Sequence, residues 1–353
     1  MTSSSAWTIH PALTIEVVAS RRRYHRYFEN EYARMATGER PDAARITAAI
    51  VQELPDEEPG DVRRSLRFKK IFTYDYVVRG LETDHVRIYF RDQPLARVYT
   101  NVVTLFLQAQ VIEPVAYLKL LERNILFMHA AGVTKGRDAY LFPAFGGTGK
   151  TTLTLGLMGE GMRVLGDDLL LVDASSGEVR RYLRPLHLFA YNIRTLRGAE
   201  VPWLVRAQVR TKDLMRAVLE PLTRQEFLIS TRVHAEELYE DFKKGKRSTV
   251  RRIVFLLREG EDHALSTTDD LAVIVDRILE SEDLNDSLYA NVLNSDQVED
   301  VVALERNVIG HVIGHVDHVS FVNTRKLDFD QLSGFKTWLL SDIGDVVPQR
   351  AVS

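Results

Sequence analysis

The first third of the chain contains short apolar runs separated by turn-forming residues. Residues 13–18 and 85–90 have the β-branched and aromatic enrichment of strands, and residues 21–28 are expected to open a helix. Residues 96–103 have strand composition too, and Asp92-Gln-Pro94 before them is typical of a turn. We therefore expect a hairpin of residues 85–90 and 96–103 within an N-terminal α+β region.

A different pattern follows from residue 104. Residues 104–123 have apolar positions at helical spacing, interrupted by Pro114, and the expected domain boundary falls at residues 110–124. Short apolar strands with glycine-rich turns then alternate with helices. The expected strands are residues 125–128, 139–143, 163–165, 169–172, 252–257 and 319–322, and the expected helices are the segment after Lys150 and residues 211–219, 235–242 and 270–280. This alternation predicts an α/β fold, with residues 1–124 as an N-terminal α+β domain and residues 125–353 as a second domain.

Composition narrows the classes of partner and chemistry. The 353 residues are 45% hydrophobic and 27% charged with a net charge of -3, which gives no indication of nucleic acid or an anionic membrane as the main partner. The basic segment 21–28 is interpreted as a solvated helix face, with a polyanion contact as the alternative. Because the chain has no cysteine, disulfides, thiolate zinc sites and cysteine nucleophiles are excluded. Without a signal pattern or an apolar run of about 20 residues, we expect a soluble, cytoplasmic protein.

A glycine-rich loop lies between a predicted strand and a predicted helix. Residues 140–152 read Tyr-Leu-Phe-Pro-Ala-Phe-Gly-Gly-Thr-Gly-Lys-Thr-Thr, with Ala144 in place of the usual first glycine. Glycines let backbone N–H groups turn toward a phosphate, Lys150 reaches the β and γ oxygens, and Thr151 offers its hydroxyl to Mg²⁺. The sequence predicts a P-loop that binds a nucleoside triphosphate with a divalent metal. Its expected nucleotide-binding residues are Gly146, Gly147, Thr148, Gly149, Lys150, Thr151 and Thr152.

Two aspartates follow the next predicted strand, in Leu165-Gly-Asp-Asp168. Beside a phosphate loop, one carboxylate can hold the metal while the other accepts a proton from an attacking hydroxyl. An exposed turn between strands is the alternative. His129 ends the strand that precedes the loop strand, so it can face the same phosphate, although a lone histidine is more often structural.

At these residues the chain resembles the HPr kinase/phosphorylase family and its relatives. The shared pieces are Met128-His129-Ala-Ala, Gly147-Thr-Gly-Lys-Thr-Thr152 and Gly166-Asp-Asp168. The phosphoenolpyruvate carboxykinases look similar over the same stretch, so the resemblance is to the superfamily. It covers about residues 125–173, with a comparable Arg-Pro-Leu element beginning at Arg184.

The resemblance implies a P-loop domain of the phosphoenolpyruvate carboxykinase/HPr kinase type. It implies that Lys150 and Thr151 bind the triphosphate and Mg²⁺, that Asp167 lies near the metal, that Asp168 is the general base and that His129 lines the phosphate site. The carboxykinase residues for oxaloacetate and the second metal are not matched, nor is the further metal carboxylate of the HPr kinases. The resemblance does not extend to residues 1–124, which are expected to select a substrate or partner.

Three weaker signals accompany the loop. The basic residues 243–247 favour a solvated turn over a lid for phosphates, and Arg184 and Arg194 are candidates for neutralising transition-state charge. A third signal is the spacing of three histidines near the C-terminus, for which we expect a β-rich or loop segment rather than a metal site. These are His311, His315 and His318.

Together these patterns predict an ATP-dependent kinase that transfers the γ-phosphoryl group to a hydroxyl of a peptide, protein or small metabolite. Asp168, Lys150 and His129 are the expected catalytic residues, and Thr151 and Asp167 the expected Mg²⁺ ligands. A nucleotide-sensing binding protein without transfer is the alternative from another class, and a carboxykinase-type lyase is the third hypothesis. Homo-oligomerisation is expected only by analogy with the HPr kinases.

Overall fold

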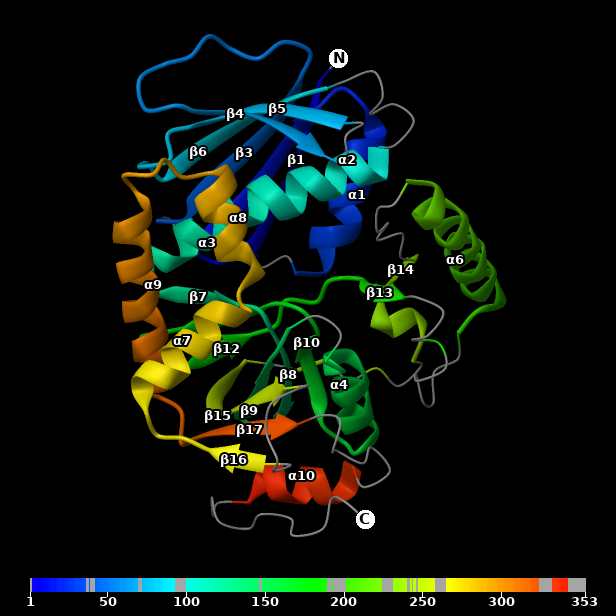
Figure 1. The fold of residues 1–353 in the computed structure, drawn as a ribbon, viewed down its shortest axis with the longest axis vertical. Helices are drawn as coiled ribbons and strands as arrows, with labels where there is room; N and C mark the ends of the chain where they lie inside the picture. The colour runs from blue at the N-terminus through cyan, green and yellow to red at the C-terminus, as the bar shows by residue number, and fades with distance from the viewer. Residues whose placement is uncertain are drawn as a thin grey trace. The chain divides into compact units, whose positions relative to one another are not determined.

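Two compact units make up the computed structural model, which describes residues 2–35, 38, 42–68, 72–92, 100–145, 148–188, 193, 201–223, 231–239, 242, 244–245, 247–257, 265–323 and 332–341. The first unit comprises Met1–Phe127, Asp173–Ser175 and Val275–Ile313, and the second comprises Met128–Val172, Ser176–Ile274 and Gly314–Ser353. Each contains a mixed sheet with helices, so the α/β class is confirmed (Figure 1).

The first unit is built on a six-stranded sheet in the order β1-β2-β3-β6-β5-β4. Strands β2, β3 and β6 pair in parallel, and the other neighbours are antiparallel. The strands are β1 (Ser3–His10), β2 (Leu13–Ala19), β3 (Ala44–Val51), β4 (Val62–Phe68), β5 (Phe72–Arg79) and β6 (His85–Arg91). The strands expected at residues 13–18 and 85–90 are therefore confirmed.

Helices cover one face of this sheet. They are α1 (Arg22–Tyr32), α2 (Thr100–Leu107), the π-helix η3 (Gln108–Ile112) and α3 (Glu113–Leu121), with a 3-10 turn η1 (Ala33–Met35) after α1. The Phe106 ring of α2 stacks on Tyr74 of β5 with centroids 3.9 Å apart. Pro114 is the second residue of α3, directly after the π-helix η3, and it has no N–H to donate to the preceding turn.

The strand expected at residues 96–103 is wrong where the structure describes it. Residues 93–99 lie outside the described residues, and Thr100 begins helix α2. Val103, Phe106 and Leu107 lie at helical spacing and are all buried, so burial of one helix face prevails over the β propensity of Val102 and Val103.

Three further helices belong wholly or partly to the first unit. They are α7 (Leu271–Ser281), α8 (Asp283–Asn291) and α9 (Val298–Ile313). Helix α3 contacts both α8 and α9, which explains why Val275–Ile313 group with the first unit and not with a contiguous domain of residues 125–353. His311 lies inside α9, so the β-rich or loop segment expected there is wrong as far as Ile313. Gly310 is tolerated within a helix whose Val308, Ile309 and Val312 are buried.

The second unit contains the larger sheet, with β10, β8, β9, β15, β12 and β11 in that order. Strand β17 also pairs with β15, and β16 with β17. The strands wholly or mostly in this unit are β8 (Ala130–Lys135), β9 (Asp138–Pro143), β10 (Arg163–Gly166), β11 (Leu170–Asp173), β12 (Glu178–Arg180), β15 (Ser248–Leu257), β16 (Leu265–Thr267) and β17 (His318–Asn323). Only the last residue of β7 (Ile125–Met128) belongs to it. Helices α4 (Lys150–Gly159) and α10 (Leu332–Leu340) bury Leu153, Leu157 and Trp338 with Phe142 and Val254 of the sheet.

A smaller element of the second unit lies near α4. It comprises the hairpin β13 (Leu186–Leu188) and β14 (Thr231–Val233), helix α6 (Trp203–Thr223) and the 3-10 turn η4 (Ala235–Glu237). The helix expected over residues 235–242 is thus a single turn, followed by buried Leu238 and Tyr239. Among the described helices, none has both the length and the apolar character to cross a membrane.

A buried carboxyl group in the first unit gives a testable pH dependence. Burial raises the pKa of Glu305 to about 7, against the opposing effect of a hydrogen bond from the Tyr117 hydroxyl, and Tyr289 also donates to Glu305. The folded protein therefore holds a proton that the unfolded chain releases above pH 4.5. The stabilisation from the neutral carboxyl is complete below pH 4.5 and is lost as the pH rises through 7.

Glu305→Gln retains an acceptor oxygen but has no charge to bury. We expect the variant to match the wild type near pH 4.5 and to be more stable above pH 7, by up to roughly 3 kcal/mol. Urea unfolding followed by circular dichroism at both pH values measures the difference. Glu299→Gln, at an exposed position of the same helix, is the matched control. A Glu305→Gln variant with the same pH response as the wild type would contradict the prediction.

Candidate active site

The glycine-rich loop connects the end of β9 to the start of α4. Strand β9 ends at Pro143 and α4 begins at Lys150, while Gly146 and Gly147 lie outside the described residues. Gly149, the residue before the helix, has φ +99°, a left-handed conformation that a side chain would strain. The first N–H groups of α4 have no partner within the helix, so this end of the helix favours an anion.

Lys150 turns back over the loop. Its side chain is only 8% exposed, and Nζ lies 2.7 Å from Nε2 of His129 and donates to the Ala144 carbonyl at 2.9 Å. His129 follows β7 directly and is also buried. His129 and the Ala144 carbonyl both contact the Lys150 ammonium group, so a positive charge is held beside the loop.

The loop is joined to the acidic pair through Thr151. The Thr151 hydroxyl donates to Oδ2 of Asp167 at 2.8 Å, which brings the first turn of α4 to the end of β10. The chain passes close to Leu169 and Leu170 at Gly166, so there is no space for a side chain at this position. A Cβ there would lie 2.7 Å from the Leu169 carbonyl oxygen and 2.8 Å from Cδ2 of Leu170.

Asp167 is the more deeply buried of the two aspartates. Burial raises its pKa to about 6; the charge of Asp168 adds to the rise, and the Thr151 hydrogen bond and Lys150 oppose it. Its second oxygen, Oδ1, is buried without a hydrogen-bond partner among the described residues. A carboxylate oxygen beside a threonine hydroxyl is a donor set that suits Mg²⁺.

These two residues would supply only part of a coordination shell. Among the described residues, no group of three or more His, Cys, Asp or Glu side chains is arranged to hold a metal ion. Mg²⁺ in proteins keeps several waters and is often bound through one or two carboxylates together with substrate phosphates. Thr151 and Asp167 therefore fit a magnesium nucleotide better than an isolated metal ion.

Asp168 points toward an imidazole and a guanidinium group. Its side chain is 53% exposed; Oδ1 lies 3.3 Å from Nε2 of His129 and Oδ2 lies 3.4 Å from Nη1 of Arg184. Desolvation alone would raise its pKa, but the hydrogen bond with His129 and the charges of Arg184 and Lys150 hold the pKa well below its ordinary value. Asp168 is thus ionised at neutral pH.

The His129 ring faces two competing partners. Nε2 can accept a hydrogen bond from the Lys150 ammonium or donate one to Asp168, but a single ring nitrogen cannot do both at once. Lys150 and Asp168 therefore compete for the same ring nitrogen.

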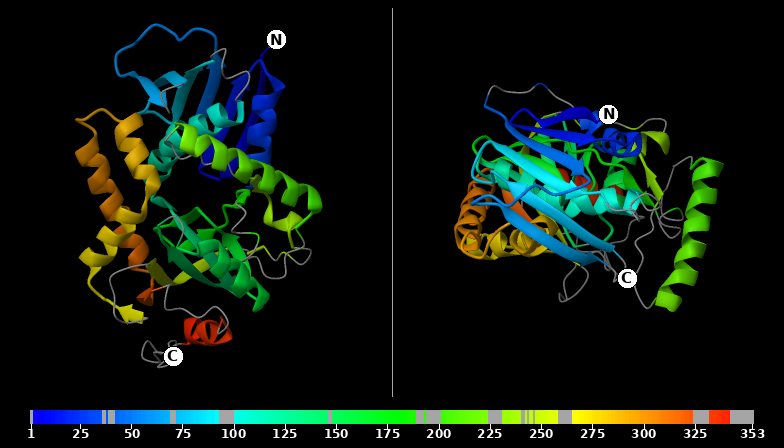
Figure 2. Two further views of the ribbon diagram at one scale, coloured as in Figure 1. Left: turned by 45° about the vertical axis from the view of Figure 1, so that its right-hand side comes forward. Right: turned by 90° about the horizontal axis from the view of Figure 1, so that it is seen from above.

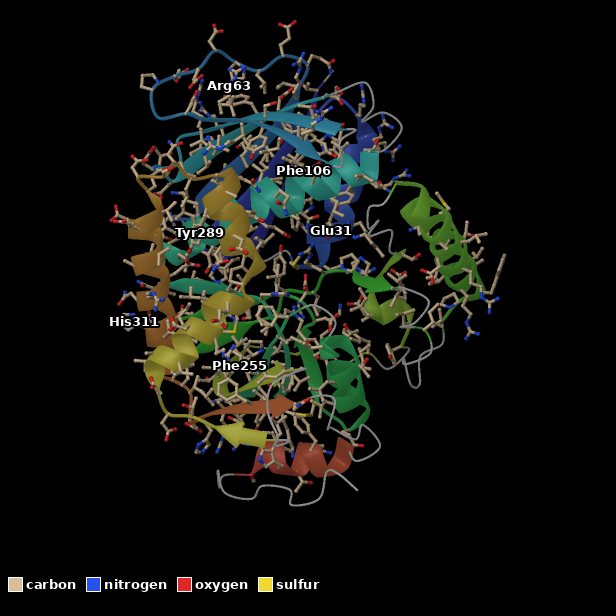
Figure 3. All side chains as sticks on the ribbon, viewed as in Figure 1. Glu31, Arg63, Phe106, Phe255, Tyr289 and His311 are labelled. Atoms are coloured by element: carbon tan, nitrogen blue, oxygen red, sulfur yellow. The ribbon has the colours of Figure 1, made fainter. Side chains whose placement is uncertain are left out.

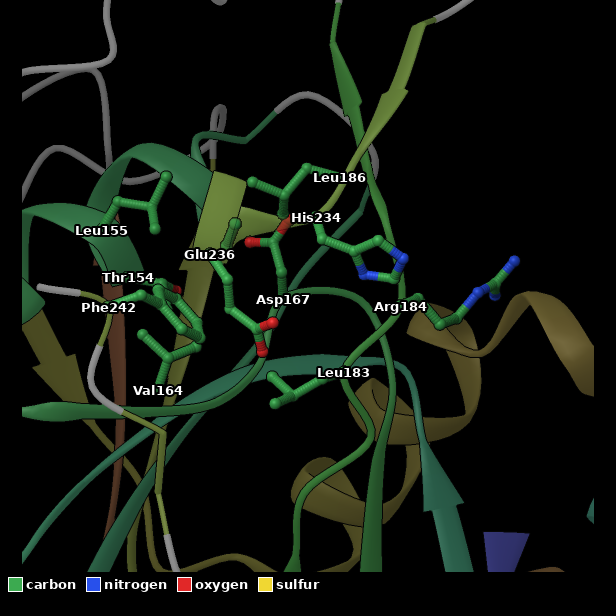
Figure 4. Close-up of a pocket in the computed structure, with 11 residues that line it drawn as sticks. Thr154, Leu155, Val164, Asp167, Leu183, Arg184, Leu186, His234, Glu236 and Phe242 are labelled. Atoms are coloured by element: carbon green, nitrogen blue, oxygen red, sulfur yellow. The ribbon is translucent and has the colours of Figure 1, made fainter. Parts of the chain in front are cut away.

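A pocket opens beside Asp167 between α4, β10, β13 and η4 (Figure 4). Its cavity volume is about 20 Å³, roughly the space of one water molecule. Its lining residues are Thr154, Leu155, Val164, Asp167, Leu183, Arg184, Leu186, His234, Ala235, Glu236 and Phe242. His234 and Glu236 were not among the residues selected from the sequence. They follow β14, far along the chain from Asp167, and no motif spacing connects them to the loop.

The structure thus brings together most of the expected site residues. His129, Lys150, Thr151, Asp167 and Asp168 are linked by contacts, and Arg184 joins them through Asp168.

Thr148 lies in the loop, and its hydroxyl donates to the Phe145 carbonyl at 2.9 Å. Thr152 lies in the first turn of α4. Arg194 lies outside the described residues, as do Lys243 and Lys246. Lys244 belongs to the same basic loop. Its Nζ lies 2.5 Å from Oε1 of Glu236, so this part of the loop contacts a residue that lines the pocket.

His315 and His318 were the remaining metal candidates. His315 lies in the turn after α9 and packs against Gly177, where an added Cβ would lie 2.9 Å from Cβ of His315. His318 is the first residue of β17.

Comparison with known proteins adds no constraint to this geometry. The chain matches no protein-family model, and a search of curated proteins found no significant match. Its chemistry is therefore argued from the contacts of Lys150, Thr151, Asp167, Asp168 and His129.

Proposed function

We propose that the protein is an ATP-dependent kinase with a hydroxyl acceptor. The observation that carries the proposal is the hydrogen bond from Thr151 to Asp167, which joins a lysine-bearing helix N-terminus to a pair of carboxylates. Phosphoryl transfer requires backbone N–H groups that bind an anion, a cation beside the phosphates, oxygen ligands for a metal ion and an ionised carboxylate near the acceptor.

In the proposed reaction, Lys150 leaves His129 and binds the β and γ oxygens of ATP. Mg²⁺, held by Thr151 and Asp167, would supply charge neutralisation on the triphosphate. The acceptor oxygen attacks the γ-phosphorus, the bond between that phosphorus and the bridging oxygen to the β-phosphate breaks, and ADP leaves. Asp168 orients the acceptor hydroxyl and receives its proton, which then passes to water.

The low pKa of Asp168 is compatible with this role. In a loose phosphoryl-transfer transition state the acceptor oxygen forms little bond before the leaving oxygen departs, so the catalytic carboxylate mainly positions the hydroxyl. Arg184, which contacts Asp168, is suitably placed to neutralise charge on the transferred group. The pocket beside Asp167 is lined by Arg184, His234 and Glu236, whose polar groups can hydrogen-bond a hydroxyl-bearing acceptor.

A nucleotide sensor without transfer is the second candidate. The contacts of Asp168 with His129 and Arg184 favour it, because a carboxylate held by an imidazole and a guanidinium is a weak proton acceptor. This candidate predicts tight ATP binding with little turnover.

The deciding experiment incubates the protein with Mg²⁺ and γ-labelled ATP in a desalted cell extract, with and without small metabolites restored. We expect label in a polypeptide if the acceptor is a protein, and label in a small molecule only with metabolites restored if it is a metabolite. Retention of label in ATP, or its release only as free phosphate, would refute the kinase and support the sensor. Oxaloacetate-dependent consumption of nucleotide would instead identify a carboxykinase-type lyase.

A further inference from the structure

His129 contacts both of the groups that the proposed reaction uses, one to bind ATP and one to orient the acceptor. Its Nε2 lies 2.7 Å from Nζ of Lys150 and 3.3 Å from Oδ1 of Asp168. All three residues belong to the second unit, around the sheet that carries Phe255 in Figure 3. Since both groups are within reach of one nitrogen, His129 can change its hydrogen-bond partner without a rotation of its ring.

Strand register places His129 beside the loop. Ala130 of β8 pairs with Pro143 of β9 in antiparallel register, so His129 and Ala144, the next residues along, lie at neighbouring positions. Lys150 reaches both of them from the first turn of α4, which contacts β8 and β10 (Figure 2, left). The backbone of His129 is therefore fixed by the sheet, whereas the long side chain of Lys150 can move from one partner to another.

Lys150 and Asp168 require opposite states of Nε2. The Lys150 ammonium can only donate, so Nε2 accepts from it and carries no proton. An ionised carboxylate can only accept, so a hydrogen bond with Asp168 requires a proton on the same nitrogen. While Lys150 donates to Nε2, this nitrogen and Oδ1 of Asp168 are two acceptors that face each other. The contact of Oδ2 with Arg184 at 3.4 Å then orients the carboxylate.

We propose that nucleotide binding transfers His129 from Lys150 to Asp168 and thereby fixes Asp168 for the acceptor. A triphosphate is a stronger partner for an ammonium than an imidazole is, because charge assists the hydrogen bond from both sides. Once Lys150 binds the phosphate oxygens, Nε2 takes up a proton from water at the exposed side of Asp168 and donates a hydrogen bond to Oδ1. The proton on Nδ1 leaves to water, so the ring stays neutral. His129 is then a positioning residue that acts through Asp168.

This change of partner makes the orientation of Asp168 depend on an occupied phosphate loop. Before ATP binds, the contact with Arg184 orients Oδ2; afterwards a hydrogen bond from His129 orients Oδ1 as well. The coupling is reciprocal, so an acceptor that holds Asp168 toward His129 also strengthens nucleotide binding. The inference deepens the kinase proposal and rests on it for the nucleotide, whereas the competition for Nε2 can be tested without any nucleotide.

¹⁵N NMR of the histidine side chains tests the proposal, because a ring nitrogen without a proton resonates well apart from one that carries a proton. The chain has 10 histidines, so the spectrum of His129→Gln identifies the His129 signals. In the wild type we expect Nε2 without a proton in the absence of nucleotide, and with a proton when Mg²⁺ and a non-hydrolysable ATP analogue are bound. Lys150→Met should show the proton on Nε2 without any nucleotide, because the competing ammonium is gone. The matched control Lys135→Met, at the exposed end of β8, should give the wild-type spectrum of His129.

A proton on Nε2 in the nucleotide-free wild type would overturn the proposal, as would its absence in Lys150→Met or in the wild type with the analogue bound. Circular dichroism checks folding, and Lys150→Leu replaces Lys150→Met if the methionine disturbs the site. If calorimetry shows that the analogue does not bind, the kinase proposal fails, and the Lys150 variants alone decide whether His129 changes partner. Binding of the analogue with no change at Nε2 refutes the change of partner and leaves the proposed reaction standing.

Discussion

Replacing Lys150 with alanine is expected to abolish detectable Mg²⁺–ATP binding and to reduce phosphoryl transfer at least about 100-fold. The ammonium group is the buried cation at the start of α4, next to the Ala144 carbonyl and His129. In the proposed reaction, its loss removes the positive charge that offsets the negative charge of the β and γ phosphate oxygens of ATP. Isothermal titration with Mg²⁺–ATP and release of label from γ-labelled ATP measure the two effects.

The control for this prediction is Lys135→Ala, at an exposed position at the end of β8. It should leave both measurements within about twofold of the wild type. Lys150→Met retains most of the apolar stem in the buried site, and it distinguishes loss of charge from loss of packing. Normal nucleotide binding by both Lys150 variants would show that the loop is not the nucleotide site.

Asp168→Asn is expected to reduce phosphoryl transfer by roughly 100-fold or more while nucleotide binding persists. The amide has nearly the shape of the carboxylate, but it carries no charge and cannot take up the acceptor proton. Removing that charge also takes away the carboxylate that the His129 ring and the Arg184 guanidinium share. Initial rates with the identified acceptor, compared with ATP affinity, separate the chemical step from binding.

Asp269→Asn, a surface substitution of the same kind, is the matched control and should transfer phosphate at the wild-type rate. Unchanged transfer by Asp168→Asn would exclude this residue as the base. Asp167, whose pKa of about 6 makes it the stronger proton acceptor, would then be the next candidate for the role. A loss of ATP affinity equal to the loss of rate would instead place Asp168 at the nucleotide.

The two aspartates illustrate how one short turn creates different environments. Asp167 lies in the interior against Thr151 and keeps one oxygen without a partner among the described residues. Asp168, one residue later, is half exposed between the His129 imidazole and the Arg184 guanidinium. Their pKa values are shifted in opposite directions, because burial raises the pKa of Asp167 while the contacts with His129 and Arg184 hold the pKa of Asp168 down.

Local patterns along the chain were sufficient for the elements around the candidate site. The glycine before Lys150 and the apolar run after it predict a loop followed by a helix, and α4 begins at that residue. The strands ending at Met128, Pro143 and Gly166 were likewise recognisable from short apolar runs between turns. Such signals are local, because helix starts and buried strands depend on neighbouring residues.

Contacts between distant residues were decided only by the tertiary structure. The strand composition of residues 100–103 was overridden when Phe106 stacked on Tyr74. The pairing of Asp168 with Arg184 and the approach of Glu236 to the pocket depend on strand order and register. Local sequence patterns therefore indicated which residues could do chemistry, and folding determined which of them meet, because pairing between distant segments has no signature in local periodicity.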